Sequence, residues 1–383
     1  MSEDLPAPPP ATPAPRPSLG LGASAAAHQM SPEPGKAVAE PSTVAAASDS
    51  VPVEDVAQRA VVELSKPTDA ERLIVGEEET TFGKQPWWSN RNYRKLPTSG
   101  PPDDVVIRSG TFGNLAVIGG TIRGTKHCPR GEVNDDYFTT TSVFHPDTAE
   151  PTFLIVVVCD GMGSAEYSSF SAKILAEATA ANLADIARQI PDTPLDDVLA
   201  FLQSNPRMLL DDVSNAVRHA VANVPSEFIR QQSHIPPADV TDRNLQSTMT
   251  FALIRVAKVG EASEALIGFI GDSPALSISD GVIHNLLEGS EGSGVFTTAT
   301  EGAIGATSLS LISHQIAPGS PLVLATDGVA NFLTYNGDPT RLGSYIAEHW
   351  SQPMPQLAFI RDMDFDFPSA DDDRTAVVIW ARD

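Results

Sequence analysis

The chain has 383 residues, which exceeds one typical domain of about 100–200 residues. It carries 49 Asp and Glu against 25 Lys and Arg, giving a formal net charge of −24. A field of this sign repels phosphate backbones and anionic lipids, so neither nucleic acid nor a membrane surface is expected as a partner. Two cysteines, Cys128 and Cys159, are too few for a disulfide framework or a four-thiolate zinc site. No apolar run approaches the ~20 residues of a membrane span, and the N-terminus is unlike a signal peptide, so we expect a cytoplasmic location.

The 32 prolines are unevenly distributed and divide the chain, since about half of them precede residue 103. Residues 1–68 are rich in Pro and Ala and lack a periodic apolar face, which predicts a disordered tail. Its PxxP-like stretches leave docking to a partner as an alternative. Residues 69–103 form a lead-in segment with Trp87–Trp88, interpreted as lying across the following domain, with a partner-binding arm as the alternative. Residues 104–383 are the predicted globular domain.

Short runs rich in Val, Ile, Thr and Phe, bounded by Gly, Asp or Pro, predict strands from residue 104 onward. Helical spacing of apolar residues predicts helices over 166–190, over 195–229 with a candidate break at Pro206, and over 340–350. This order favours layered sheets with helices outside over regular βαβ alternation. The predicted strands cover 104–109, 114–122, 136–144, 152–159, 246–257, 264–271, 273–280, 321–326 and 374–381.

Aspartates occupy the ends of several predicted apolar strands, an unfavourable place for a charge. A single strand-end Asp usually forms a turn or caps a helix, but here five such positions occur in one domain. If these ends converge, the carboxylates repel one another and their pKa values rise unless cations neutralise them. An all-oxygen cluster suits Mg²⁺ or Mn²⁺, whereas zinc or copper favours His or Cys. The positions are Asp135–Asp136, Asp160, Asp272, Asp327 and Asp371–Asp373.

These aspartates lie in short segments that are weak signals alone but specific in their order and spacing. The segments are RGTKHCPRGEVNDDYF (123–138), VVVCDGMGSAEYSSFSA (156–172), STMTFALI (247–254), FIGDSPAL (269–276), LATDGVANFL (324–333) and DDRTAVVI (372–379). Together they resemble the metal-dependent protein serine/threonine phosphatases of the type 2C (PPM) family, in their bacterial-type variant, over roughly 115–383. The resemblance implies an α+β fold, a four-layer α-β-β-α sandwich with a two-metal centre at one end of the paired sheets.

The resemblance also implies a role for each matching residue. Asp160 matches the family residue that bridges both metal ions, and the carbonyl of Gly161 matches a ligand of one of them. Asp327 and Asp372 match terminal ligands of the other ion. Asp272 matches a carboxylate that, with Asp327, can hold a more weakly bound third metal.

Two further acidic positions belong to the first motif. Asp135 aligns with its acidic or amide position, and Asp136 with the partner that contacts metal or metal-bound water. Ser247 and Thr248 match a Ser-Thr pair in a core strand, for which we expect a structural role.

The implied reaction is hydrolysis of phosphoserine or phosphothreonine without a covalent enzyme intermediate. Two Mn²⁺ or Mg²⁺ ions would generate a bridging hydroxide for in-line attack on phosphorus and would neutralise phosphate charge. The substrate would then be a phosphorylated protein, and the chain would oppose a Ser/Thr kinase.

Departures from the family pattern concern the leaving group and the phosphate. Met162 stands where many relatives have a His that can protonate the leaving alcohol, so the proton would come from a metal-bound water or another residue. His127 is the nearby histidine in sequence, with a loop or packing role as the alternative to a catalytic one. The position of the family's phosphate-binding Arg is Gly131 here, so Arg130 and Arg123 are the neighbouring candidates. Asp373 replaces a family Asn and adds negative charge beside the metals.

The sequence is also compatible with two alternatives to an active phosphatase. A pseudophosphatase would use the same fold to bind phosphoproteins, which the shifted arginine favours and the retained carboxylates oppose. A non-catalytic interaction protein would act through the Pro/Ala tail.

Overall fold

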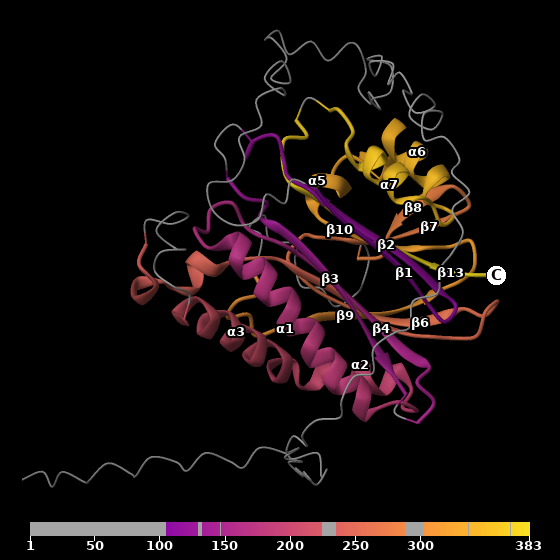
Figure 1. Ribbon diagram of the computed structural model, residues 1–383, viewed down its shortest axis with the longest axis horizontal. Helices are drawn as coiled ribbons and strands as arrows, with labels where there is room; N and C mark the ends of the chain where they lie inside the picture. The colour runs from indigo at the N-terminus through magenta and orange to yellow at the C-terminus, as the bar shows by residue number, and fades with distance from the viewer. Residues whose placement is uncertain are drawn as a thin grey trace, which may run out of the picture. The chain divides into compact units, whose positions relative to one another are not determined.

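A computed structural model describes residues 105–128, 132–145, 147–223, 235–287, 302–335, 337–367 and 369–383. The tail predicted over 1–68 and the lead-in segment with Trp87–Trp88 lie outside these residues. So do Arg130 and Gly131 of the first motif. Within the described ranges two large antiparallel sheets face each other, with helices on their outer sides (Figure 1).

The first sheet has six strands and contains both ends of the described chain. Its neighbours pair antiparallel throughout, in the order β1-β2-β13-β10-β7-β8. β1 therefore forms an edge, while β13 lies inside the sheet between β2 and β10. The strands are β1 (Val105–Phe112), β2 (Leu115–Ile122), β7 (Ala275–Ser279), β8 (Val282–Asn285), β10 (Leu322–Ala325) and β13 (Arg374–Ala381).

The second sheet has five strands in the order β3-β4-β5-β6-β9, also antiparallel. A separate two-stranded pair joins β11 (Thr334–Tyr335) to β12 (Asp338–Pro339). The five strands are β3 (Asp136–Phe144), β4 (Pro151–Asp160), β5 (Met249–Arg255), β6 (Ser263–Ile270) and β9 (Ser310–Ile316).

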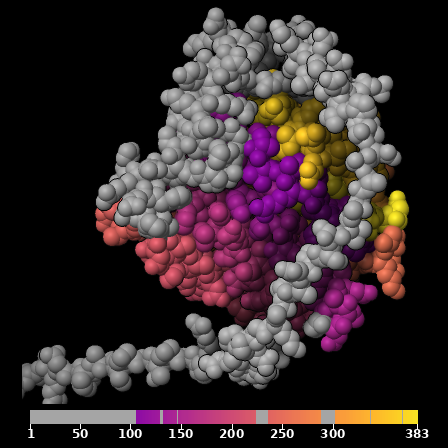
Figure 2. Space-filling view, in the orientation of Figure 1, coloured from indigo at the N-terminus to yellow at the C-terminus, as the bar shows by residue number. Residues whose placement is uncertain are grey.

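Helices cover the outer face of each sheet. α1 packs on β3 and β4, α2 packs on β6 and β9, and α3 packs on α1 and α2. On the other side, α6 packs against β8, and α7 against β1 and β2. Figure 1 shows α1, α2 and α3 on one side of the strands and α6 and α7 on the other, and in Figure 2 the magenta atoms and the yellow atoms lie on opposite sides of the indigo ones. The helices are α1 (Ser168–Gln189), α2 (Leu195–Ser204), α3 (Pro206–Asn223), α5 (Asp327–Ala330), α6 (Arg341–His349) and α7 (Gln356–Met363), with 3-10 turns η4 (Pro237–Asp239) and η5 (Asp242–Leu245).

The predicted four-layer α-β-β-α sandwich is therefore confirmed, and its core has one apolar cluster between each pair of layers. The sequence of β4 is a continuous apolar run because both faces of this strand are buried. Phe153, Ile155 and Val157 contact the helix side, whereas Leu154 and Val156 contact the six-stranded sheet. Among the described helices, none combines the length and the apolar character needed to cross a lipid bilayer.

Several element boundaries differ from the sequence prediction. The candidate break at Pro206 in the helix predicted over 195–229 is confirmed, because α2 ends at Ser204 and Pro206 begins α3. The last residues of that predicted helix, 224–229, lie outside the described ranges. The strand predicted from 246 begins at Met249, and at Thr248 the side-chain hydroxyl accepts the bond from the Asp160 N–H. β8, β9 and α7 were not predicted.

One close contact between the sheets involves a glycine. A Cβ atom at Gly119 of β2 would lie 2.6 Å from the ring of Phe138 in β3. The missing side chain leaves room for that ring, which is 2% exposed and belongs to the central cluster. Phe138 therefore fixes the spacing of the sheets close to the start of β3.

We expect Phe138→Ala to lower the free energy of unfolding by about 3–5 kcal/mol, because it leaves a cavity between two packed sheets. Phe144→Ala is the matched control on the same strand, since Phe144 is 51% exposed, and should change stability by less than about 0.5 kcal/mol. Urea unfolding followed by circular dichroism measures both values. Equal losses for the two variants would contradict the assigned packing.

Candidate active site

Carboxylates from both sheets meet at one end of the sandwich. Asp136, the first residue of β3, pairs in register with Asp160, the last residue of β4. Asp327 follows β10, and Asp372 lies just before β13, so both come from the six-stranded sheet. Asp272 is exposed on the connection between β6 and β7. The structure thus brings together the strand-end aspartates that the sequence singled out.

Burial and mutual repulsion dominate the electrostatics of this cluster. The pKa of Asp160 is well above its usual value, first because the group is buried and then because of the charges of Asp136, Asp327, Asp372 and Asp272. Burial is also the largest cause of the raised pKa of Asp327, followed by repulsion from Asp372 and Asp272. Without a cation beside them, Asp160 and Asp327 resist ionisation.

Asp135 and Asp136 follow the same rule, with a different principal neighbour. Burial raises the pKa of Asp135 to about 7, and the charge of Asp373 adds to this effect. The pKa of Asp136 is also well above its usual value, through burial and then through Asp373. Thr326 opposes this shift by donating a hydrogen bond to Asp136 Oδ2 at 2.8 Å.

Hydroxyl groups hold the backbone of Asp160 in place. Ser247 Oγ donates to the Asp160 carbonyl at 2.8 Å, and the Asp160 N–H donates to Thr248 Oγ1 at 3.1 Å. The Thr248 N–H also donates to the Asp160 carbonyl, at 2.8 Å. These bonds agree with the structural role expected for Ser247 and Thr248.

The glycines that follow two of the aspartates allow backbone segments to approach closely. A Cβ at Gly161 would lie 2.7 Å from the Asp135 carbonyl oxygen, to which the Gly161 N–H already donates at 3.1 Å. A Cβ at Gly328 would lie 1.9 Å from the Asp373 carbonyl oxygen. Backbone packing between strand ends therefore requires both glycines.

His127 lies beside the carboxylate cluster and is buried. Its Nδ1 is 3.1 Å from both carboxylate oxygens of Asp373, and its Nε2 is 3.9 Å from Asp135 Oδ2. Burial alone would lower the pKa of His127, but the bond to Asp373 and the charges of Asp373 and Asp135 outweigh it and raise the pKa. The three side chains form a His-Asp-Asp group whose ligand atoms lie within 4.8 Å of one another.

Lys126 is a site residue that the sequence analysis missed. Its Nζ lies 2.5 Å from Asp372 Oδ1, and its side chain is one-third exposed. Burial alone would lower the pKa of Lys126, but the bond to Asp372 and the nearby carboxylates raise it, so the ammonium ion persists. Its position directly before His127, in the first motif, was the available signal.

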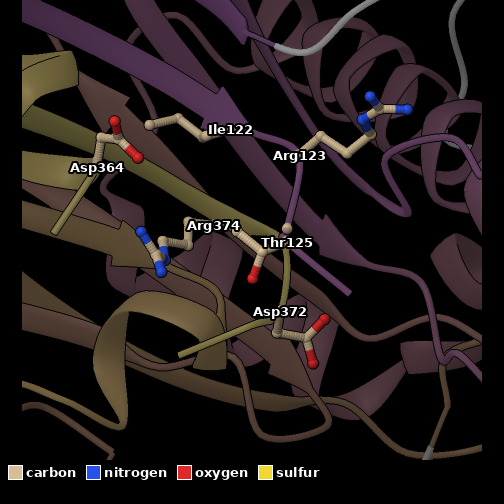
Figure 3. A pocket seen from close by; sticks show the side chains of 7 residues that line it. Ile122, Arg123, Thr125, Asp364, Asp372 and Arg374 are labelled. Carbon is tan, nitrogen blue, oxygen red and sulfur yellow. The ribbon is translucent and has the colours of Figure 1, made fainter. Parts of the chain in front are cut away.

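Two arginines border the small pocket beside Asp372 (Figure 3), and both donate hydrogen bonds to backbone carbonyls. Arg123 is 1% exposed and donates to the Glu132 carbonyl at 2.8 Å, and in Figure 3 its side chain extends away from Thr125. Arg374 donates to the carbonyls of Met363, Phe365 and Ala370. This burial argues against Arg123 as the phosphate-binding residue, while Arg130 lies outside the described residues.

The chemistry of the donor set fits hard divalent cations. The cluster offers carboxylate oxygens, and the raised pKa values of Asp136, Asp160 and Asp327 mean that a nearby positive charge would stabilise their ionised forms. Mg²⁺ and Mn²⁺ prefer such oxygen donors. Fold and donor set together define an α+β sandwich with an acidic candidate metal centre spanning its two sheets.

Comparison with known families agrees with this arrangement. The family described as protein phosphatase 2C matches residues 123–357, more than half of the chain and including the residues from Lys126 to Asp327 discussed above. The chain therefore belongs to the protein phosphatase 2C family. No curated protein sequence matches it.

Solved structures of low sequence identity are similar to this chain. PppA, a regulatory component of the T6SS in Pseudomonas aeruginosa, is 18% identical, with 72% of this chain and 100% of that chain covered and a TM-score of 0.40. The catalytic domain of the phosphatase PstP, solved with two manganese ions, is 16% identical, with coverage of 73% and 100% and a TM-score of 0.39. The PPM Ser-Thr phosphatase MsPP of Mycobacterium smegmatis, solved with cacodylate, is 19% identical, with coverage of 70% and 99% and a TM-score of 0.41.

The raised carboxyl pKa values predict how the metal-free protein responds to pH. A carboxyl group whose pKa is higher when folded binds more protons in the folded state, so stability falls as pH rises through that range. For Asp135 the range runs from about 4, its value in unfolded chains, to about 7. The raised pKa of His127 acts in the same direction.

We therefore expect the melting temperature of chelator-treated protein to decrease between pH 5 and pH 8, because the folded-state pKa of Asp135, about 7, lies within this range. Asp135→Asn should flatten this dependence, because it removes one titrating group. Differential scanning fluorimetry across buffers of equal ionic strength measures the effect. A melting temperature that increases steadily with pH would contradict the electrostatics described here.

Proposed function

We propose that this chain is a metal-dependent phosphoprotein phosphatase that hydrolyses phosphoserine and phosphothreonine. The observation that carries the proposal is the convergence of Asp136 and Asp160 with Asp327 and Asp372, each pair from a different sheet. Such costly burial of like charges is expected where cations are bound, and membership of the protein phosphatase 2C family supports the same reaction. Phosphorylated proteins are the proposed substrates, in opposition to a Ser/Thr kinase.

The residues proposed to hold two Mn²⁺ or Mg²⁺ ions are Asp136, Asp160 and the Gly161 carbonyl, together with Asp327 and Asp372. When bound, such ions lower the pKa of water for attack on phosphorus and neutralise charge on the phosphate. Asp160 is suited to a shared position because four other carboxylates act on it.

Asp135 and Asp272 occupy the margins of this set. Asp272 acts electrostatically on both Asp160 and Asp327, which supports its proposed part in a weaker third site. Asp135 lies next to Asp136 and interacts with His127. Its side chain is 18% exposed, so it can reach a ligand from the outside of the cluster.

His127 is the proposed proton donor for the leaving alcohol in the place of the family's His, where this chain has Met162. Its Nδ1 is held by Asp373, which leaves Nε2 directed toward Asp135. Arg130 is proposed to contact the substrate phosphate on sequence grounds alone.

Lys126 is a second proposed phosphate contact. Its ammonium group is the partly exposed cation that the described residues place against Asp372, and it stays charged. A cation at this point offsets the negative field that a phosphate meets on approach.

We expect purified protein to release phosphate from p-nitrophenyl phosphate and from a phosphothreonine peptide only with added Mn²⁺ or Mg²⁺. Asp160→Asn should reduce this turnover on the order of 100-fold or more, because it removes a central charge of the site. Asp212→Asn, an exposed aspartate on α3, is the matched control and should leave turnover unchanged. Release of phosphate is followed by malachite green, with excess chelator as the zero point.

A wild-type protein that shows no metal-dependent turnover above Asp160→Asn would contradict an active phosphatase. If that protein still bound a phosphothreonine peptide, the pseudophosphatase alternative would be favoured. The observation that favours this second candidate is Gly131, which stands where the family has its phosphate-binding Arg.

Lys126→Ala should raise the KM for a phosphothreonine peptide by about 10-fold, because a charge-assisted hydrogen bond to phosphate contributes roughly 1.5–3 kcal/mol. Lys258→Ala, at an exposed position far along the chain, is the control and should leave KM unchanged. Steady-state kinetics at saturating Mn²⁺ measure both. If Lys126 serves only as a counter-ion for Asp372, its removal will instead lower the Mn²⁺ concentration needed for activity and leave KM unaltered.

A further inference from the structure

Asp373 joins three separate parts of the site through one buried carboxylate. Its Oδ1 accepts a hydrogen bond from the Gly124 N–H at 2.5 Å, and its Oδ2 accepts one from the Asp135 N–H at 2.6 Å. His127 Nδ1 lies 3.1 Å from both oxygens. The side chain is 1% exposed, so these partners replace water almost completely.

We propose that Asp373 is a positioning residue, whose carboxylate sets the spacing of the metal-holding residues without itself binding metal or substrate. The proposal rests on the function proposed above. It gives a reason why this chain has Asp373 where the family has an Asn. Asp373 acts through its neighbours in the chain, because it directly follows Asp372 and bonds the residue that directly precedes Asp136.

Hydrogen-bond geometry explains why this position requires a carboxylate. The two backbone N–H groups approach different oxygens, so both oxygens must accept. An amide has a single acceptor oxygen, and either orientation of an Asn would set its NH₂ group against one of these N–H donors. A buried N–H without an acceptor is costly, so an amide here favours displacement of either the Gly124 or the Asp135 segment.

The bond from Asp135 to Asp373 also crosses from one sheet to the other. Asp373 precedes β13, which pairs with β2 in the six-stranded sheet, and Gly124 follows β2. Asp135 precedes β3 of the five-stranded sheet. Because Asp136 and Asp372 come from different sheets, their separation depends on such cross-sheet ties. The Thr326–Asp136 bond is a second tie of this kind.

The test compares Asp373→Asn with Asp371→Asn. Both variants remove one charge from the same loop, but Asp371 is exposed and contributes its backbone carbonyl to Lys126, which the substitution leaves intact. In metal-free protein, hydrogen exchange followed by mass spectrometry should be faster for residues 121–128 and 132–138 in Asp373→Asn only. Isothermal titration with Mn²⁺ should give a dissociation constant raised by about 10-fold or more for Asp373→Asn.

Kinetics separate positioning from direct participation. With p-nitrophenyl phosphate, Asp373→Asn should require a higher Mn²⁺ concentration for half-maximal activity, while KM at saturating Mn²⁺ stays unchanged, because Asp373 does not touch substrate. A changed KM with unchanged Mn²⁺ binding would overturn the proposal. So would hydrogen exchange identical to that of wild type.

A second variant keeps the proposal testable if Asp373→Asn does not fold. His127→Asn removes the imidazole donor and leaves both backbone ties, so exchange should accelerate in 121–128 and stay unchanged in 132–138. Acceleration in 132–138 as large as that in 121–128 would overturn the proposal, because both backbone bonds to Asp373 are intact in this variant. Failure of the proposed function has a different signature, namely a wild-type protein without Mn²⁺-dependent turnover, and the exchange experiment on metal-free protein remains decisive in that case.

Discussion

Repulsion among buried carboxylates at one end of the sandwich is the interaction around which this structure is organised. Asp136, Asp160 and Asp327 all have raised pKa values, with burial as the first cause and neighbouring carboxylates as the next. Left alone, such groups would separate or take up protons. They remain together because strand register and strand ends on two rigid sheets hold them there.

Ties between the sheets convert that rigidity into site geometry. Thr326 bonds Asp136 across the sheets, and Asp373 bonds the Asp135 backbone in the same way. Ser247 and Thr248, which directly precede the neighbouring strand β5, bond to the Asp160 backbone and hold it in place. The apolar clusters stabilise the fold, and these polar bonds favour one arrangement of the carboxylates within it. The stable core and the unfavourable site therefore depend on the same strands.

Much of the fold could be predicted because its strands are strongly apolar or clearly bounded. β4 reads as a strand from its continuous apolar run, and Pro206 marks the break between α2 and α3. β9 was missed because Ser313, His314 and Gln315 interrupt its apolar pattern at the sheet edge. α7 was missed because it is a short helix after Pro355 that depends on packing against β1 and β2.

The sequence by itself determined the family and the candidate ligands, because aspartates at the ends of apolar strands form a local pattern that needs no contact map. Only the tertiary structure decided which charges face one another. It buried Arg123 against the Glu132 carbonyl, brought Lys126 to Asp372, and bonded Gly124 to Asp373 across 249 positions of the chain. Such contacts depend on sheet order and register, which place distant strand ends side by side and which no local pattern encodes.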